Sequence, residues 1–153
     1  MRSALLADLE ENIMAEFTAI SLTEVEEGQN ILFTETPICP TKGIIHREGS
    51  GIVRVSGNGA QGRARYLVSF SGNIQIPTGG TVGEISVAIA IDGEHLSSTQ
   101  MIVTPAAVEN LFNVSSQAYI DVPCGCCVTI AVENTSDQAI EVQNANLIVV
   151  RVA

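Results

Sequence analysis

Short apolar runs separated by Gly- and Pro-containing turns fill the chain from residue 16 to its end. This regular alternation of runs and turns limits the possible folds more than any other feature of the sequence. The runs are rich in Val and Ile, which favour extended strands. GIIHR and GIVRVSG flank an EGSG turn at 48–51, the pattern of a β-hairpin. This spacing predicts an all-β sandwich of roughly nine or ten strands. The further strands are expected at 17–22, 30–35, 64–77, 84–94, 98–105, 116–123, 126–134, 139–144 and 145–153.

The first residues follow a different pattern. Residues 3–14 predict a short amphipathic helix that Ser3 can cap, because apolar residues recur there at helical spacing. A helix this short is marginal in water unless its apolar stripe packs on something. We therefore expect a docking segment at 1–15 and a folded domain at 16–153, unless Met14 is the natural start of the protein. The docking stripe consists of Leu5, Leu6, Leu9 and Ile13.

Charge narrows the classes of partner. The chain carries 17 acidic and 7 basic residues, a net charge of -10. Such a surface repels polyanions, so nucleic acid is not an expected partner. No stretch approaches the ~18 apolar residues of a transmembrane helix, so no membrane partner is expected either. Asp8, Glu10 and Glu11 interrupt the N-terminal apolar stretch, so a conventional signal peptide is not expected.

Several strands are more apolar than a strand with one solvent-facing side requires. Residues 85–91 alternate Ile and Val with Ser and Ala, and residues 147–150 are apolar at every position. A strand buried on both faces needs a covering layer. Because one sandwich domain has no helices to supply that layer, a second subunit is the simplest cover.

Three cysteines stand within four positions, at Cys124, Cys126 and Cys127. A structural zinc site needs four ligands, usually in paired spacing, and Cys39, His46 and His95 are remote in sequence. Neighbouring positions in a strand point to opposite faces, so Cys126 and Cys127 would separate. We therefore interpret the cysteines as small, buried apolar residues. A Cys39–Cys124 disulfide stays open, since sequence does not fix connectivity.

No arrangement of residues supports catalysis. His46 and His95 are isolated from any nucleophile, and the GNGAQG loop at 57–62 lacks the Lys-Ser/Thr of a phosphate-binding loop. The turn DGEH at 92–95 lacks the alternating ligands of a calcium loop. The sequence thus predicts a structural or binding protein, not an enzyme, with no metal and no cofactor.

The segments SGNIQIPTGGTVGEISVAIAIDGE and YIDVPCGCCVTIAVENTS, followed by the apolar last strand VQNANLIVVRVA, carry a resemblance. They resemble the TNF/C1q-like jelly-roll superfamily over residues 16–153. The likeness is greatest to the C-terminal domains of bacterial collagen-like surface proteins and to related small structural proteins of gut Firmicutes and their phages.

The resemblance implies a jelly roll of ten strands that assembles as a homotrimer, with one sheet facing the three-fold axis. It implies that the interface draws on the apolar strands 66–70 and 147–152. The collagen-like proteins carry a Gly-X-Y stalk, and this chain has an acidic N-terminal segment instead, which favours docking onto a larger assembly. The expected interface residues are Tyr66, Val68, Phe70, Ile148 and Val150.

These expectations lead to a function based on assembly. The first hypothesis is a phage virion protein, made in the bacterial cytoplasm, that decorates a capsid or forms part of a head fibre and binds other virion proteins through its N-terminal segment. The alternative is a receptor- or glycan-binding adhesin head of a phage fibre or of a bacterial cell or spore surface. A small hydrolase or redox enzyme built on the cysteines is the third hypothesis.

Overall fold

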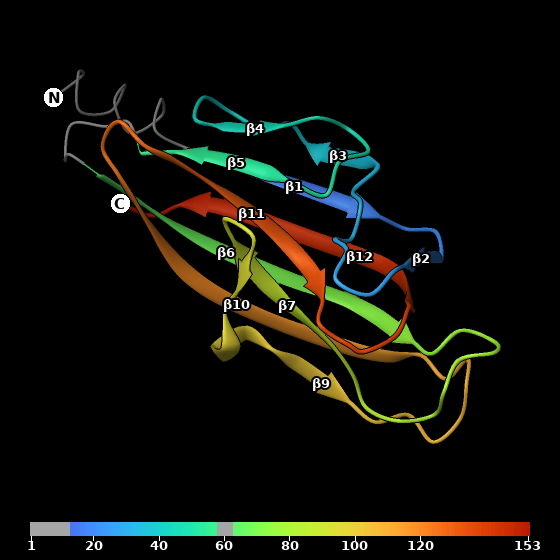
Figure 1. Cartoon of the computed structure of the whole chain (residues 1–153). Coiled ribbons are helices and arrows are strands. Elements are labelled where there is room, and N and C mark those ends of the chain that lie inside the picture. Colours follow the sequence, from blue (N-terminus) through green and yellow to red (C-terminus); the bar gives the residue numbers. More distant parts are fainter. Residues whose placement is uncertain (1–12, 58–62) are drawn as a thin grey trace, which may run out of the picture.

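The computed structural model describes residues 13–57 and 63–153, which form two packed antiparallel sheets (Figure 1). The first sheet has the strand order β10-β6-β12-β1-β3, and β2 pairs with β12 beside this path. Its strands are β1 (Met14–Ala19), β2 (Thr23–Val25), β3 (Glu35–Ile38), β6 (Arg63–Gln75), β10 (Phe112–Pro123) and β12 (Ile140–Arg151).

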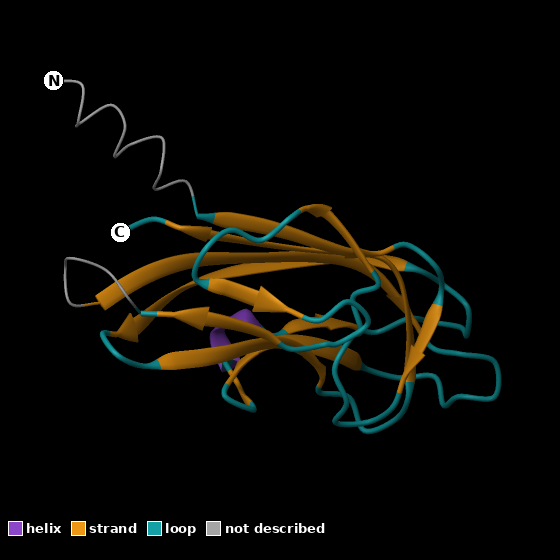
Figure 2. Cartoon of the chain, turned by 90° about the horizontal axis from the view of Figure 1, so that it is seen from above, coloured by secondary structure: helices purple, strands orange, loops and turns teal. Residues whose placement is uncertain are grey.

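The second sheet has the order β4-β5-β11-β7-β8, and β9 pairs with β7. A 3-10 turn, Ser97–Thr99, precedes β9. Seen from above, the two sheets lie face to face as two layers (Figure 2). The strands are β4 (Ile44–His46), β5 (Val53–Ser56), β7 (Ile85–Ile91), β8 (Glu94–His95), β9 (Met101–Val103) and β11 (Cys127–Asn134). The predicted all-β sandwich is therefore confirmed.

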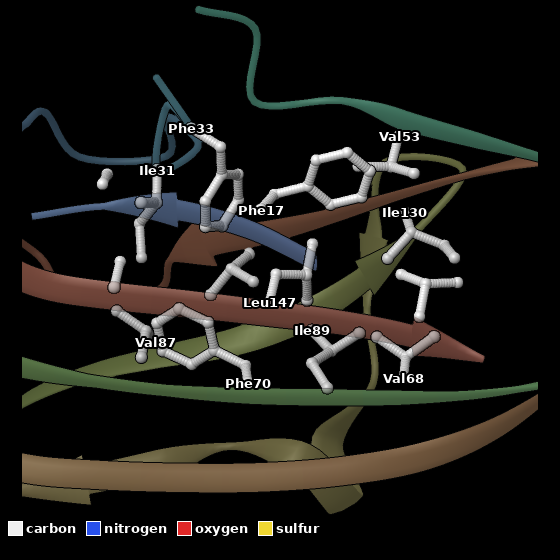
Figure 3. Close-up of a cluster of buried hydrophobic side chains, with 14 of the residues drawn as sticks. Phe17, Ile31, Phe33, Val53, Val68, Phe70, Val87, Ile89, Ile130 and Leu147 are labelled. Carbon is white, nitrogen blue, oxygen red and sulfur yellow. The ribbon is translucent and has the colours of Figure 1, made fainter. Parts of the chain in front are cut away.

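Alternation along the long strands builds the core. In β6 the even-numbered residues from Ala64 to Phe70 are buried, and the odd-numbered residues are partly exposed. In β12 a register shift between Gln143 and Asn146 precedes buried Leu147 and Val149. Such a shift allows each long strand to keep its apolar face inward along its whole length. Figure 3 shows these side chains gathered between the two sheets.

Buried polar groups in this core have partners. The hydroxyl of Tyr66 donates to the backbone oxygen of Ser56 at 2.7 Å, and burial raises the pKa of the phenol. The amide nitrogen of Asn134 donates to the oxygens of Val25 and Gln138, each at 3.0 Å. These bonds connect the β2 region to the end of β11. They also satisfy a buried amide whose unpaired state would lower the stability of the fold.

The start of the chain differs from the expectation. Met14 pairs with Val150 in β1, so the helix predicted over 3–14 does not extend to its expected end. Ile13 packs against the core, and its oxygen accepts a hydrogen bond from the Arg151 nitrogen at 2.8 Å. Its partly buried side chain therefore belongs in part to the sandwich, and its place in a docking stripe stays a prediction. The rest of the stripe, Leu5, Leu6 and Leu9, lies outside the described residues.

Candidate functional site

Three of the residues expected at a subunit interface lie inside the sandwich. Tyr66, Val68 and Phe70 are almost wholly buried within the single chain. They occupy the inward positions of β6, because they form its more apolar alternate set. Their expected role at an external interface was therefore wrong. Ile148 and Val150 do face outward on β12, where Ile148 is 38% exposed and Val150 is half-buried.

The outward side of the first sheet, which we call the outer face, carries an apolar row across four adjacent strands. Met14 of β1 pairs with Val150 of β12, Val150 pairs with Leu67 of β6, and Leu67 pairs with Tyr119 of β10. Tyr119 is 68% exposed and Met14 37%. Paired side chains stand close enough to form one continuous surface. This row therefore joins four strands of the first sheet by apolar side chains on its exterior.

A more polar band lies beside this row. Glu16 pairs with Ile148, Ile148 with Ser69, and Ser69 with Gln117. The Ser69 hydroxyl donates to Gln117 Oε1 at 3.2 Å, and Asn146 Nδ2 donates to Glu16 Oε2. The small serines leave a shallow hollow of about 430 Å³ between larger neighbours. Its outward-facing lining is Ser69, Ser71, Ser115, Gln117, Asn146 and Ile148.

An ion pair closes one end of the outer face. Arg65 donates to both carboxylate oxygens of Asp121, at 2.7 and 3.1 Å, and Arg63 lies 3.8 Å from Asp121 Oδ2. The hydrogen bond from Arg65 lowers the pKa of the Asp121 carboxyl and raises that of the guanidinium. A second hollow of about 380 Å³ lies here, lined by Arg65, Tyr119, Asp121, Val152 and Ala153. The ion pair therefore borders the apolar row along its side on β6 and β10.

A third hollow, of about 540 Å³, lies at the far end of the sandwich from this ion pair. Its polar lining residues hydrogen-bond to one another. Ser86 Oγ and Thr135 Oγ1 lie 2.7 Å apart, and Gln138 Nε2 donates to the Thr81 oxygen at 2.7 Å. Hydroxyls, amides and two carboxylates line it, without any aromatic ring. The lining residues are Thr81, Val82, Gly83, Glu84, Ser86, Gln100, Thr135, Ser136, Asp137 and Gln138.

The cysteines differ from their expected burial. Cys39, Cys124, Cys126 and Cys127 are all exposed, free thiols. The Cys39–Cys124 disulfide is therefore not formed in the structure. Sequence alternation missed this arrangement because Cys124 and Cys126 belong to the turn before β11, where no sheet covers them.

The two histidines have structural contacts. His46 Nε2 lies 2.8 Å from the Ser50 oxygen, and its ring packs against Phe17 with a centroid distance of 4.5 Å. His95 Nδ1 lies 3.6 Å from Glu133 Oε1. Within residues 13–57 and 63–153, no three His, Cys, Asp or Glu side chains lie close enough to hold a metal ion. In that same part of the chain, no helix has the length and apolarity needed to cross a membrane.

Sequence reasoning missed Met14, Leu67 and Tyr119, which the structure brings together on the outer face. The signal that could have found them is the two-residue period of β6. Once Tyr66, Val68 and Phe70 are assigned to the core, Leu67 must face outward.

Comparison with known proteins identifies the fold. No family model matches the sequence, and no curated protein sequence matches it. Among solved structures, Eiger TNF from S. frugiperda superposes with a TM-score of 0.66 at 15% identity, over 94% of both chains. Murine APRIL at pH 8.5 gives 0.62 at 10% identity, over 92% of this chain and 99% of that one.

The globular domain of zebrafish complement 1qA protein also gives a TM-score of 0.62 at 10% identity, over 92% of this chain and 96% of that chain. Together these matches show that the chain has the TNF/C1q-like jelly-roll fold. The TNF/C1q-like sandwich expected from the sequence resemblance is thereby confirmed, but the described residues form twelve strands and not the expected ten.

Proposed function

We propose that the chain forms a homotrimer through the outer face of its first sheet and acts by assembly, as a capsid decoration or head-fibre component of a phage. The observation that carries this proposal is the apolar row of Met14, Val150, Leu67 and Tyr119. Four adjacent strands present it in register on the outward side of the sheet. A soluble chain seldom leaves such an ordered apolar patch uncovered.

The fold supports three copies around an axis. TNF/C1q-like folds typically form homotrimers, and in the resemblance described above one sheet faces the three-fold axis. The outer face supplies exposed apolar side chains near one end of the sheet and polar groups, such as Gln117 and Asp121, on either side of them. Burial of the apolar surface that the single chain leaves exposed contributes about 25 cal/mol per Å².

The virion location rests on the resemblance to phage structural proteins and on the N-terminal segment. The chain enters β1 at Met14, at the end of the sandwich where β12 finishes. The stripe Leu5, Leu6 and Leu9 precedes this entry and would dock the trimer onto other virion proteins. A bacterial cell or spore surface is the alternative location, and the same docking segment would serve there.

Light scattering on the purified chain under reducing conditions tests the interface. We expect a mass near 48 kDa, three times the 16.1 kDa of one chain. Tyr119→Asp and Leu67→Asp place charge in the apolar row and should give monomers. Ile45→Asp is the matched control, because Ile45 is 66% exposed but lies on β4 in the other sheet. A trimer that survives both outer-face variants contradicts the proposed interface.

Docking needs a separate test. Deletion of residues 1–12 removes the Leu stripe and leaves β1 intact from Met14. The truncated chain should keep the trimer mass but lose co-sedimentation with phage particles. Particle binding at the full-length level would refute the docking role and leave the trimer untouched.

A receptor- or glycan-binding adhesin head is the second candidate, favoured by the polar hollow of about 540 Å³. Its hydroxyl and amide groups suit a polyhydroxylated ligand, although stacking on aromatic rings is not available there. Binding on a glycan array that Gln100→Ala and Gln138→Ala abolish would support this function. An array without binding would exclude glycans as its ligand class.

A further inference from the structure

Four thiols are exposed, and three of them, Cys124, Cys126 and Cys127, lie together at one end of the sandwich. Cys127 pairs with Ser56, the last residue of β5. The turn that carries Cys124 and Cys126 joins β10 to β11 at this same end, where the C-terminus also lies (Figure 1). Cysteine is among the most frequently buried residue types. Packing therefore does not explain why all four are at the surface.

The turn has a defined backbone conformation. The Cys126 nitrogen donates to the Pro123 oxygen at 3.1 Å and closes a four-residue β-turn. Gly125 has a φ of +79°, in the left-handed region that favours glycine. Cys124 and Cys126 thus flank the one glycine on which the turn depends. The thiols belong to an ordered structure rather than to an irregular loop.

Gly57 holds this turn against the sandwich. Its nitrogen donates to the Cys126 oxygen at 3.0 Å. A Cβ added at Gly57 would lie only 2.0 Å from the Pro123 oxygen and 2.6 Å from the Val122 oxygen. The two backbone segments therefore touch directly, and only glycine fits between them. This contact fixes the position at which the thiols face solvent.

Pairing within the chain is unfavourable for the adjacent thiols. Consecutive Cα atoms are about 3.8 Å apart, which is shorter than the ~4.4–6.8 Å that a disulfide spans. This excludes an unstrained Cys126–Cys127 bond. Cys39 and Cys124 are both free as well. An exposed, ordered thiol cluster without an internal partner is suited to reaction with another molecule.

We propose that the thiol turn, Cys124–Cys127, links the chain covalently to a second copy of itself by thiol–disulfide exchange. This inference rests on the proposed trimer. The turn directly follows β10, and Asp121 and Tyr119 of the outer face precede it by only a few residues. Three-fold symmetry would bring three such turns to the same end of the assembly, beside the interface.

The chemistry needs an added disulfide as oxidant, and glutathione disulfide provides it. A turn thiolate attacks one sulfur of glutathione disulfide, forming a mixed disulfide and releasing one glutathione thiolate. A turn thiolate of the second copy then attacks the protein sulfur and displaces the second glutathione. Two protein thiols lose two electrons and two protons, and one glutathione disulfide becomes two glutathione thiols.

The test uses the full chain incubated with glutathione disulfide, quenched with N-ethylmaleimide and examined by non-reducing gel electrophoresis and intact mass. We expect dithiothreitol-sensitive covalent dimers and trimers at a rate independent of protein concentration, because the reacting copies already share one trimer. Cys39→Ser is the matched control and should cross-link normally. The triple variant Cys124→Ser, Cys126→Ser and Cys127→Ser should not cross-link, yet should keep the trimer mass in solution.

Each other outcome overturns the inference. Glutathionylated monomers alone would make the turn a modification site without a second copy. A monomer lighter by two hydrogens would show a disulfide within one chain instead of a link between copies. Cross-links that persist in the triple variant would place the reaction at Cys39. A wild-type chain that is monomeric by light scattering would refute the trimer itself, whereas a trimer without cross-links would refute only the covalent link.

Discussion

Truncation of two neighbouring residues of β6 should affect different properties: Val68 faces the core and determines the stability of the fold, whereas Leu67 faces the proposed interface and determines the stability of the trimer. Val68 is wholly buried and stands between Ala118 of β10 and Val149 of β12. Val68→Ala removes about two methylene equivalents, or about 1.6 kcal/mol of transfer free energy, and leaves a small cavity. We expect a loss of about 2 kcal/mol in the free energy of unfolding.

For a domain of this size, that loss lowers the thermal midpoint by about 4–8 °C. Leu67→Ala removes a half-buried side chain and should lower the stability of the isolated chain by less than about 1 kcal/mol. It should instead weaken the trimer, since each 1.4 kcal/mol lost at the interface raises the dissociation constant about tenfold.

Thermal unfolding at fixed protein concentration, combined with light scattering over a dilution series, separates the two effects. Val68→Ala should melt earlier but keep its trimer mass in the folded state. Leu67→Ala should dissociate at higher concentrations than the wild type. The reverse pattern, with dissociation caused by Val68→Ala and an unaffected Leu67→Ala trimer, would refute the assignment of the two faces.

The other predictions concern single contacts. Gly57→Ala should lower the free energy of unfolding by at least about 2 kcal/mol in chemical denaturation, because the added Cβ collides with the Pro123 oxygen. In the control Gly93→Ala the added Cβ has no neighbouring atom, so only the smaller cost of its positive φ should appear. Asn134→Ala should lower stability by about 2–4 kcal/mol through the loss of several buried hydrogen bonds, and an unchanged midpoint would contradict their importance. The Asp121 carboxyl of the wild type should titrate by NMR at a lower pH than the same carboxyl in Arg65→Gln. Because folding lowers its pKa, the Arg65–Asp121 pair stabilises the folded state above the unfolded pKa of about 4, and this stabilisation is lost as pH falls through the folded pKa. Added salt should weaken it.

The sequence was sufficient for the class of fold because that class depends on local patterns. Alternating Val and Ile runs with Gly and Pro between them predict strands and turns wherever they occur, and the hairpin around 48–51 is one of them. The pairing of β12 with both β1 and β6 brings together residues far apart in sequence, such as Met14 with Val150 and Gln75 with Glu141. Local pattern carries no information on such long-range pairs, so the resemblance had to supply the topology.

The errors at the candidate site have a common cause. Residues 66–70 are apolar at four of five positions, so the pattern alone does not state which alternate set faces the core. The structure assigns the larger set to the core and leaves Leu67 outside. Similarly, Cys124 and Cys126 resembled strand residues because Val and Thr follow them, but Gly125 closes a turn that no second sheet covers. Burial depends on the packing of distant segments, which neither pattern encodes.

The mass of the wild-type chain in solution tests the central claim most directly. Sedimentation equilibrium or native mass spectrometry of the full chain, in the presence of reductant, measures this mass without any substitution. We predict a single species of about 48 kDa, three times the 16.1 kDa chain. A species of 16.1 kDa at every accessible concentration would contradict assembly through the outer face.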